Sequence, residues 1–310
     1  MKRNRQPYHP EQTRQVAARQ DAGGASGVMP WRIWRLTGRG DHSLEGGVVI
    51  EEPLEIRLSG RTVAVLMRTP GMEKELAAGF CLGEGLVAGL MDIALVRHCG
   101  RTMAEETSSE TVAEDALDGS RNRVDVTLMP AATAADNPSG HGAGQIEVVQ
   151  FIRSGCGRTD VSTLAEGLAP IEARVTIKAD VLRRLGGQIT RQQAAYRAAG
   201  GIHAAAVFDT NGRCLVVCED IGRHNAVDKA TGYCLLRGIS LADKLLVSTG
   251  RASYDMVAKG ARLGVPIIAS ISSPTSLAVE LAEALNCTLL GYLRGKNLNV
   301  YTHGWRIVTS

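Results

Sequence analysis

Short apolar runs alternate with amphipathic stretches through the last third of the chain. The runs occupy 245–247, 267–271 and 289–293, and the stretches at 252–263 and 276–285 have helical periodicity. This alternation is typical of parallel strands joined by crossover helices. We therefore predict an α/β fold with a largely parallel sheet covered by helices on both faces.

The chain before this sheet has shorter and more varied elements. Alternating segments at 54–58 and 62–68 predict two strands joined at Ser59-Gly60, and apolar residues recur at helical spacing from 72 to 85. The acidic segment 101–144 is expected to be a surface insertion with one strand at 123–129, and strand composition returns at 148–152. We predict three parts: a disordered tail (1–29), a smaller α+β domain (30–165) and the α/β domain (166–310).

Residues 200–229 combine a hairpin with a high density of polar groups. Apolar runs at 204–208 and 214–218 flank Asp209-Thr210-Asn211-Gly212, a turn sequence that favours a hairpin. Seven polar residues follow within one strand exit and the start of a predicted helix: Glu219, Asp220, Arg223, His224, Asn225, Asp228 and Lys229. This cluster suggests the wall of a binding site around His224, although a structural salt-bridge network would use the same residues.

Polar loops follow each of the three predicted parallel strands. They contain glycine, serine and threonine, together with the basic residues Arg251, Arg294 and Lys296. Functional residues of such sheets gather at the carboxyl ends of strands, and exposed backbone N–H groups there suit phosphate or pyrophosphate. Upstream, Thr190 followed by Gln193 fits a capping box and predicts a helix from there to Gly200-Gly201.

Cys156 differs from the other six cysteines. Glycines flank it and Arg153 and Arg158 bracket it, and cationic neighbours lower the pKa of a thiol and favour the reactive thiolate. An incidental cysteine in a flexible loop is the alternative. Cys214 and Cys218 are expected to share one face of a strand. The remaining cysteines are Cys81, Cys99, Cys234 and Cys287, and no spacing fits a structural zinc site.

The composition is that of an ordinary globular protein. With 310 residues, of which 44% are hydrophobic, the chain can bury one large core or two smaller ones. A formal charge of +3 is too small to suggest nucleic-acid binding. Because no apolar run could span a bilayer and the N-terminus lacks the apolar core of a secretory signal, we expect a soluble cytoplasmic protein without membrane contact.

The chain also contains four long motifs, which are GGIHAAAVFD, EDIGRHNAVDK, STGRASYDMVAKGARLGVPIIASISSPTSLAVELA and LLGYLRGKNLNVYTH. Together they closely resemble the formate dehydrogenase accessory sulfurtransferase family, FdhD, and the resemblance runs from about Trp31 to His303, apart from the acidic insertion. It implies a homodimer with a cytidine-deaminase-like three-layer α/β domain. The hydrolytic zinc set of deaminases is absent from the sequence, which argues against base deamination.

The resemblance also implies a function. Cys156 would accept sulfane sulfur from a cysteine desulfurase as a persulfide and pass it to the molybdenum of a bis(molybdopterin guanine dinucleotide) cofactor, which formate dehydrogenase needs. GDP-like nucleotides are expected to mimic this cofactor, and the family's cofactor segment falls on 292–297. The residues assigned to cofactor binding are His224, Ser248, Gly250, Arg251, Ser273, Thr275, Tyr292, Leu293, Arg294, Gly295, Lys296 and Asn297.

One departure from the family keeps other hypotheses open. Many members carry C-G-x-C where this chain has the single thiol of Cys156. A mechanism that needs two neighbouring cysteines is therefore in doubt, and a cofactor-binding chaperone without sulfur transfer is the second hypothesis. A third is a small-molecule hydrolase that uses Cys156 with His224.

Overall fold

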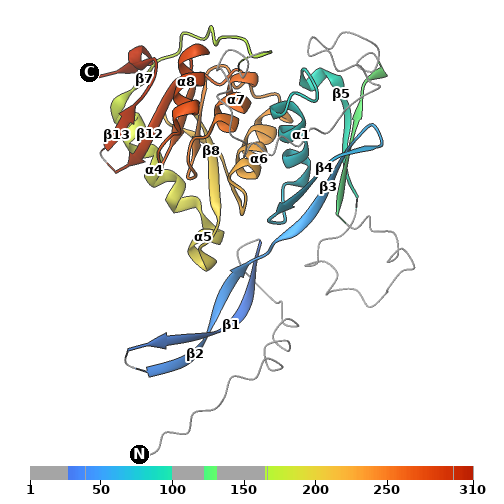
Figure 1. The fold of residues 1–310 in the computed structure, drawn as a ribbon, viewed down its shortest axis with the longest axis vertical. Coiled ribbons are helices and arrows are strands. Elements are labelled where there is room, and N and C mark those ends of the chain that lie inside the picture. The colour runs from blue at the N-terminus through green and yellow to red at the C-terminus, as the bar shows by residue number, and fades with distance from the viewer. Residues whose placement is uncertain are drawn as a thin grey trace, which may run out of the picture.

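The computed structural model describes residues 27–38, 40–99, 122–130, 165, 167–295 and 297–309. A six-stranded sheet organises the C-terminal half of the chain (Figure 1). Its strands, in sheet order, are β13 (Asn297–Val300), β12 (Thr288–Arg294), β11 (Ile267–Ser270), β10 (Lys244–Ser248), β8 (His203–Asp209) and β9 (Cys214–Asp220).

This sheet is mixed, so the prediction of a largely parallel sheet is wrong. Only β10–β11 and β11–β12 are parallel pairs, whereas β8–β9, β8–β10 and β12–β13 are antiparallel. Tight hairpins at β8–β9 and β12–β13 reverse the chain, and crossover helices connect β9 to β10, β10 to β11 and β11 to β12. Because β9 runs in the same direction as β10, β11 and β12, four strands still end at one edge of the sheet, which we call the carboxyl edge.

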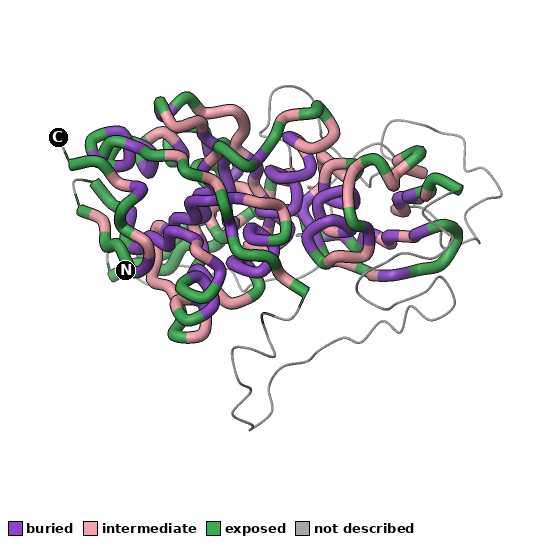
Figure 2. Tube along the Cα trace, turned by 90° about the horizontal axis from the view of Figure 1, so that it is seen from above, coloured by how far each residue is buried: buried purple, intermediate pink, exposed green. Residues whose placement is uncertain are grey.

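Helices cover both faces of the six-stranded sheet and give three layers. The helices α6 (Arg223–Leu235), α7 (Tyr254–Arg262) and α8 (Ser276–Ala284) pack on one face, and α4 (Ala179–Gln192) packs on the other. Successive residues of β8, β10 and β11 alternate between the two cores, and buried stretches run through the interior of this body (Figure 2). The finer assignment to a cytidine-deaminase-like fold stays a prediction.

A second sheet of four strands lies on the other side of α6. Its strands, in sheet order, are β4 (Arg61–Arg68), β3 (Glu52–Leu58), β6 (Arg123–Leu128) and β5 (Ile93–Cys99). Ser59 and Gly60 join β3 to β4 with φ values of 46° and 85°, so the predicted strand pair is confirmed. Helix α1 (Glu73–Gly83) covers one face of the sheet, where Leu54, Ile56 and Leu76 are fully buried.

Two glycines allow α1 and α6 to cross with their backbones in contact. A Cβ atom on Gly79 would lie 2.0 Å from the carbonyl oxygen of Asp228, and one on Gly232 would lie 1.9 Å from the carbonyl oxygen of Glu75. Any larger residue at either position would push the helices apart. This crossing joins the two sheets into one body.

The remaining elements are small or peripheral. The antiparallel ribbon of β1 (Val28–Thr37) and β2 (Gly40–Val49) projects away from the body and touches α5 (Ala194–Ala199) (Figure 1). Since β1 begins at Val28, the last residues of the predicted tail belong to a strand, while residues 1–26 lie outside the described residues. The short elements are η2 (Leu90–Asp92), β7 (Ile177–Lys178), η5 (Gly304–Arg306) and β14 (Ile307–Val308).

Two local predictions fail for identifiable reasons. Thr190 does not begin a helix, because α4 already begins at Ala179 and the Thr190 hydroxyl donates to the Gly186 carbonyl one turn earlier, at 3.1 Å. Cys214 and Cys218 lie on opposite faces of β9, because a bulge shifts the register between Val207 and Phe208 and changes the alternation. The predicted strand at 148–152 and most of the acidic insertion lie outside the described residues.

Candidate functional site

The carboxyl edge gathers the polar loops that follow four strands of the six-stranded sheet. Backbone hydrogen bonds join neighbouring loops: the N–H of Ile271 donates to the Ser248 carbonyl at 2.9 Å, and the N–H of Tyr292 donates to the Ser272 carbonyl at 2.9 Å. The loops after β10, β11 and β12 therefore lie side by side in one row. The order of strands in the sheet, and not the distance along the chain, brings these segments together.

Several of the candidate residues shape these loops. Ser248 is fully buried, and its hydroxyl accepts a hydrogen bond from the N–H of Gly250 at 3.2 Å. The hydroxyl of Thr275 accepts one from the N–H of Ala278 at 3.3 Å and caps α8. Leu293 is only 2% exposed and belongs to the core beneath α4, so its side chain is not available to a ligand at the surface.

A second group of candidates lies at the surface of the carboxyl edge, namely Arg251, Tyr292, Arg294, Gly295 and Asn297, with Ser273 half-buried among them. The Nε of Arg294 donates to the carbonyl of Ile271 at 2.8 Å, which holds this guanidinium beside the β11 loop. Tyr292 has a φ of 53°, and the residue is 43% exposed. Lys296 lies outside the described residues.

Arg223 also lies at this edge; the sequence prediction included it in the polar cluster but not among the residues assigned to cofactor binding. Its side chain packs against Gly250, where an added Cβ would lie 2.9 Å from the Arg223 Cβ and Cδ atoms. Its Nε is buried and has no hydrogen-bond partner among the described residues. The position of Arg223 beside His224 in the EDIGRHNAVDK motif was the available signal.

Two histidines near Arg223 are held neutral. Burial, followed by the charges of Arg223 and Lys259, lowers the pKa of His224 to about 4, and its Nε2 lies 3.3 Å from the Ser253 hydroxyl. Burial and then Arg223 lower the pKa of His203 as well. Both imidazoles are therefore uncharged at pH 7, and each offers one hydrogen-bond donor and one acceptor.

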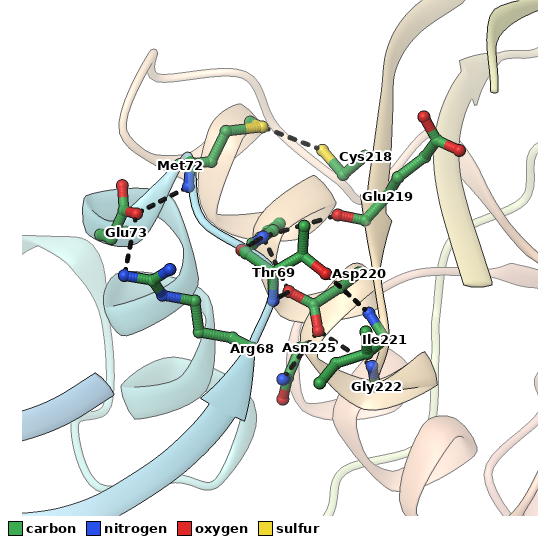
Figure 3. Close-up of polar contacts among 12 residues, drawn as sticks. Arg68, Thr69, Met72, Glu73, Cys218, Glu219, Asp220, Ile221, Gly222 and Asn225 are labelled. Atoms are coloured by element: carbon green, nitrogen blue, oxygen red, sulfur yellow. Dashed lines mark hydrogen bonds and ion pairs between the residues drawn. The ribbon is translucent and has the colours of Figure 1, made fainter. Parts of the chain in front are cut away.

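Asp220, Asn225 and Lys229 form a buried structural network (Figure 3), whereas the Glu219 carboxylate accepts hydrogen bonds from the N–H groups of Ala195 and Tyr196 at the start of α5. The Lys229 ammonium lies 2.7 Å from an Asp220 carboxylate oxygen and donates to the Thr69 carbonyl at 2.7 Å. The Asp220 carboxylate also accepts from the N–H groups of Thr69 and Gly222 and from the Asn225 amide. The salt-bridge alternative holds for these residues, because they join the segment after β4 to α6.

A second buried ion pair lies where α1, α6 and α7 meet. The Lys259 ammonium is 2.7 Å from both carboxylate oxygens of Asp228 and 2.9 Å from Glu84. Burial raises the pKa of Asp228 to about 6, although Lys259 opposes this shift. Burial alone would lower the pKa of Lys259, but Asp228 and Glu84 outweigh it and raise that pKa.

Five of the six cysteines in the described residues are poor nucleophiles. Burial raises the pKa of Cys81, Cys218 and Cys287 to about 12 and that of Cys234 to about 11, and it raises the pKa of the half-buried Cys214 as well. Cys99 is half-buried and donates to Asp125 at 3.5 Å. Cys156, Arg153 and Arg158 lie outside the described residues.

Neither a metal cluster nor a membrane span is found in the part of the chain that the structure describes. No group of three or more His, Cys, Asp or Glu side chains there could hold a metal ion. No helix there is long and apolar enough to cross a bilayer.

Comparison with known proteins finds relatives of one name that align with most of the chain. The sulfur carrier protein FdhD of Mycobacterium tuberculosis is 38% identical over 268 residues, which cover 84% of this chain and 91% of the relative. The protein of the same name from Anaeromyxobacter dehalogenans strain 2CP-1 is 37% identical over 302 residues, which cover 94% and 98%.

A solved structure and a family profile agree with these relatives. The crystal structure of a protein from Desulfotalea psychrophila, assigned as a formate dehydrogenase accessory protein, superposes with a TM-score of 0.67 at 25% identity and covers 91% of this chain and 99% of the other. Residues 49–308 match the FdhD/NarQ family. These residues contain both sheets and every loop of the carboxyl edge, and on this evidence the chain belongs to the FdhD/NarQ family.

Proposed function

We propose that this protein is a cytoplasmic sulfurtransferase that carries persulfide sulfur from a cysteine desulfurase to the molybdenum bis-guanine-dinucleotide cofactor of a formate dehydrogenase. The supporting observation is the alignment with proteins named sulfur carrier protein FdhD over 84–94% of the chain. The solved relative assigned as a formate dehydrogenase accessory protein supports the identity of the recipient enzyme. The homodimer is part of the same proposal.

The first step is a thiol exchange at Cys156. Its thiolate attacks the outer sulfur of the donor's cysteine persulfide, a new S–S bond forms on Cys156, and the S–S bond of the donor breaks. The donor leaves as a thiolate and the persulfide proton stays with the transferred sulfur, so no electrons are gained or lost. The raised pKa values of Cys81, Cys218, Cys234 and Cys287 support Cys156 as the carrier by contrast.

Release of the sulfur as sulfide requires two electrons. A neighbouring thiol could supply them by forming a disulfide, but the SGCGR loop contains only Cys156. We therefore assign this role to an external thiol reductant, which becomes oxidised to a disulfide as Cys156 returns to the thiol. This requirement separates the chain from relatives with paired cysteines in the loop.

The carboxyl edge is the proposed binding place of the dinucleotide. Arg251 and Arg294 supply exposed guanidinium groups for phosphate oxygens, and the half-buried Arg223 has an Nε without a partner among the described residues. Neutral His224 and His203 donate or accept hydrogen bonds there without adding charge. The structure supports this assignment because backbone hydrogen bonds hold the loops side by side in one row.

The test is mass spectrometry after incubation with a cysteine desulfurase and free cysteine. One sulfur atom added to Cys156 is the expected result, with loss of that species after treatment with a reductant. The Cys156→Ala variant should take up no sulfur. Cys99→Ser, which changes a half-buried thiol elsewhere in the chain, should behave like the wild type. Equal labelling of Cys156→Ala and wild type would refute the carrier function and leave the chaperone hypothesis.

A further inference from the structure

An open groove of about 530 Å³ lies between the outer face of α4 and the turn that joins β12 to β13. Arg184, Gly187, Gln188 and Arg191 of α4 line it, and Gly295 of the turn lies opposite. The volume is within the range of roughly 300–1,000 Å³ that small-molecule sites occupy. The groove is separate from the row of loops described above and shares only Gly295 with it.

The helical spacing brings the two arginines to one side of α4. Arg184, Gln188 and Arg191 stand at i, i+4 and i+7, so their side chains follow one solvent-facing stripe about 10 Å long. Gly187 interrupts this stripe with a position that has no side chain. An added Cβ there would meet only one atom within 4 Å, the Nη1 of Arg191 at 3.5 Å, so this guanidinium folds back over the glycine.

The charge of the groove is not compensated. A third arginine, Arg183, pairs with Asp180 on the same helix. Neither Arg184 nor Arg191 pairs with a carboxylate among the described residues, and no lining residue is acidic. Two guanidinium groups beside an open stretch of helix backbone are suited to an oxyanion, because each presents planar pairs of N–H donors that match two oxygens.

We propose that this groove binds a phosphate-class anion, either inorganic pyrophosphate or the diphosphate of a nucleotide, between Arg184 and Arg191 over Gly187. The site does not depend on sulfur transfer, and only the nucleotide as a source rests on the proposed function. Gly187 forms the floor of the groove and lets the anion approach the helix. Gln188 adds amide donors to the same wall, although its Nε2 already donates to the Gly212 carbonyl at 3.2 Å.

Isothermal titration with inorganic pyrophosphate tests the site on the full chain. Wild type should bind with saturation, and Arg184→Gln/Arg191→Gln should bind at least tenfold more weakly. Gly187→Leu should lose binding to a similar extent by filling the groove. This variant should also melt no lower than wild type, because glycine is an unfavourable residue inside a helix. Arg61→Gln, which removes an exposed arginine from β4, is the matched control and should bind like wild type.

Three results would overturn the proposal: no saturable pyrophosphate binding to wild type, an unchanged affinity in Gly187→Leu, or an equal loss in Arg61→Gln. A parallel titration with GDP and guanosine identifies the source. If GDP binds more tightly than pyrophosphate and the groove variants weaken both, the anion belongs to a nucleotide. If the variants weaken pyrophosphate alone, the site takes the free anion. Weak GDP binding in every variant would instead count against the dinucleotide site of the carboxyl edge.

Discussion

Two buried ion pairs should respond differently to replacement, and this difference tests the structural role of the polar cluster. Lys229 pairs with Asp220, and Lys259 pairs with Asp228, in each case at 2.7 Å and with side chains that are at most 5% exposed. Lys229→Met or Lys259→Met leaves a buried carboxylate without its cation. We expect each single substitution to cost about 3–5 kcal/mol of unfolding free energy.

Removal of the carboxylate as well should rescue only one of the pairs. Among the described residues the Asp228 carboxylate accepts hydrogen bonds only from Lys259, so Lys259→Met/Asp228→Leu strands no buried donor. The Glu84 carboxylate also loses the Lys259 cation, but it is half-exposed. Asp220 also binds the N–H groups of Thr69 and Gly222, and both lose their acceptor in Lys229→Met/Asp220→Leu. At about 1–3 kcal/mol for each unsatisfied buried donor, the second double variant should stay several kcal/mol below wild type.

The assay is urea unfolding of the four variants and wild type, followed by circular dichroism and analysed at a common slope m. The Lys259/Asp228 double variant is expected within about 1.5 kcal/mol of wild type, on the grounds that well-packed apolar replacements of buried ion pairs are often neutral. Equal rescue of both pairs would refute the reasoning, because it would mean that Asp220 does not organise the backbone between β4 and α6.

Three further predictions follow from the geometry. Gly79→Ala should destabilise by about 1–3 kcal/mol in thermal or urea unfolding, because its Cβ would lie 2.0 Å from the Asp228 carbonyl, whereas Gly187→Ala, in an open helical position, should not; equal effects would contradict the close crossing. Between pH 7 and pH 5 the wild type should lose about 2 kcal/mol more unfolding free energy than His224→Gln. The reason is that the pKa of His224 is about 4 in the folded protein and near 6.5 in the unfolded chain, so protonation below pH 6.5 favours the unfolded chain. The raised pKa of Asp228 stabilises both proteins as the pH falls over this range, so its contribution cancels in the difference. Parallel pH profiles would show that His224 is not held neutral. Arg294→Ala should weaken GDP binding about tenfold in isothermal titration, roughly 1.4 kcal/mol, with Arg61→Ala unchanged; an unaltered affinity would remove Arg294 from the site.

Much of the α/β body could be predicted because its signals are local. The runs at 245–247, 267–271 and 289–293 and the helices between them match β10 to β12, α7 and α8 within a few residues, and the hairpin turn ends at Gly212 with a φ of 82°. The start of α4 was missed because its N-cap, Lys178, makes no side-chain cap. The bulge in β9 could not be predicted from the alternation of apolar and polar residues in the sequence.

The site was harder to predict because its contacts are distant in sequence. The density of polar residues after β9 was evident, but the Asp220 carboxylate and the Lys229 ammonium bind Thr69, about 150 residues earlier. When the cluster is considered without the segment around Thr69, all of its polar residues resemble a ligand site. The structure separates the buried network of Asp220, Asn225 and Lys229 from half-buried Arg223 and His224 at the carboxyl edge, and this separation depends on tertiary packing. The Glu219 carboxylate binds the start of α5 instead.

The most direct test of the central claim is restoration of formate dehydrogenase activity in cells that lack their own carrier. Wild type and Cys99→Ser should both restore activity, and Cys156→Ala should restore none while accumulating to the same level as a folded protein. Activity restored by Cys156→Ala would contradict sulfur transfer through Cys156. In that case the protein would serve as a cofactor chaperone, and its function would depend on the carboxyl edge alone.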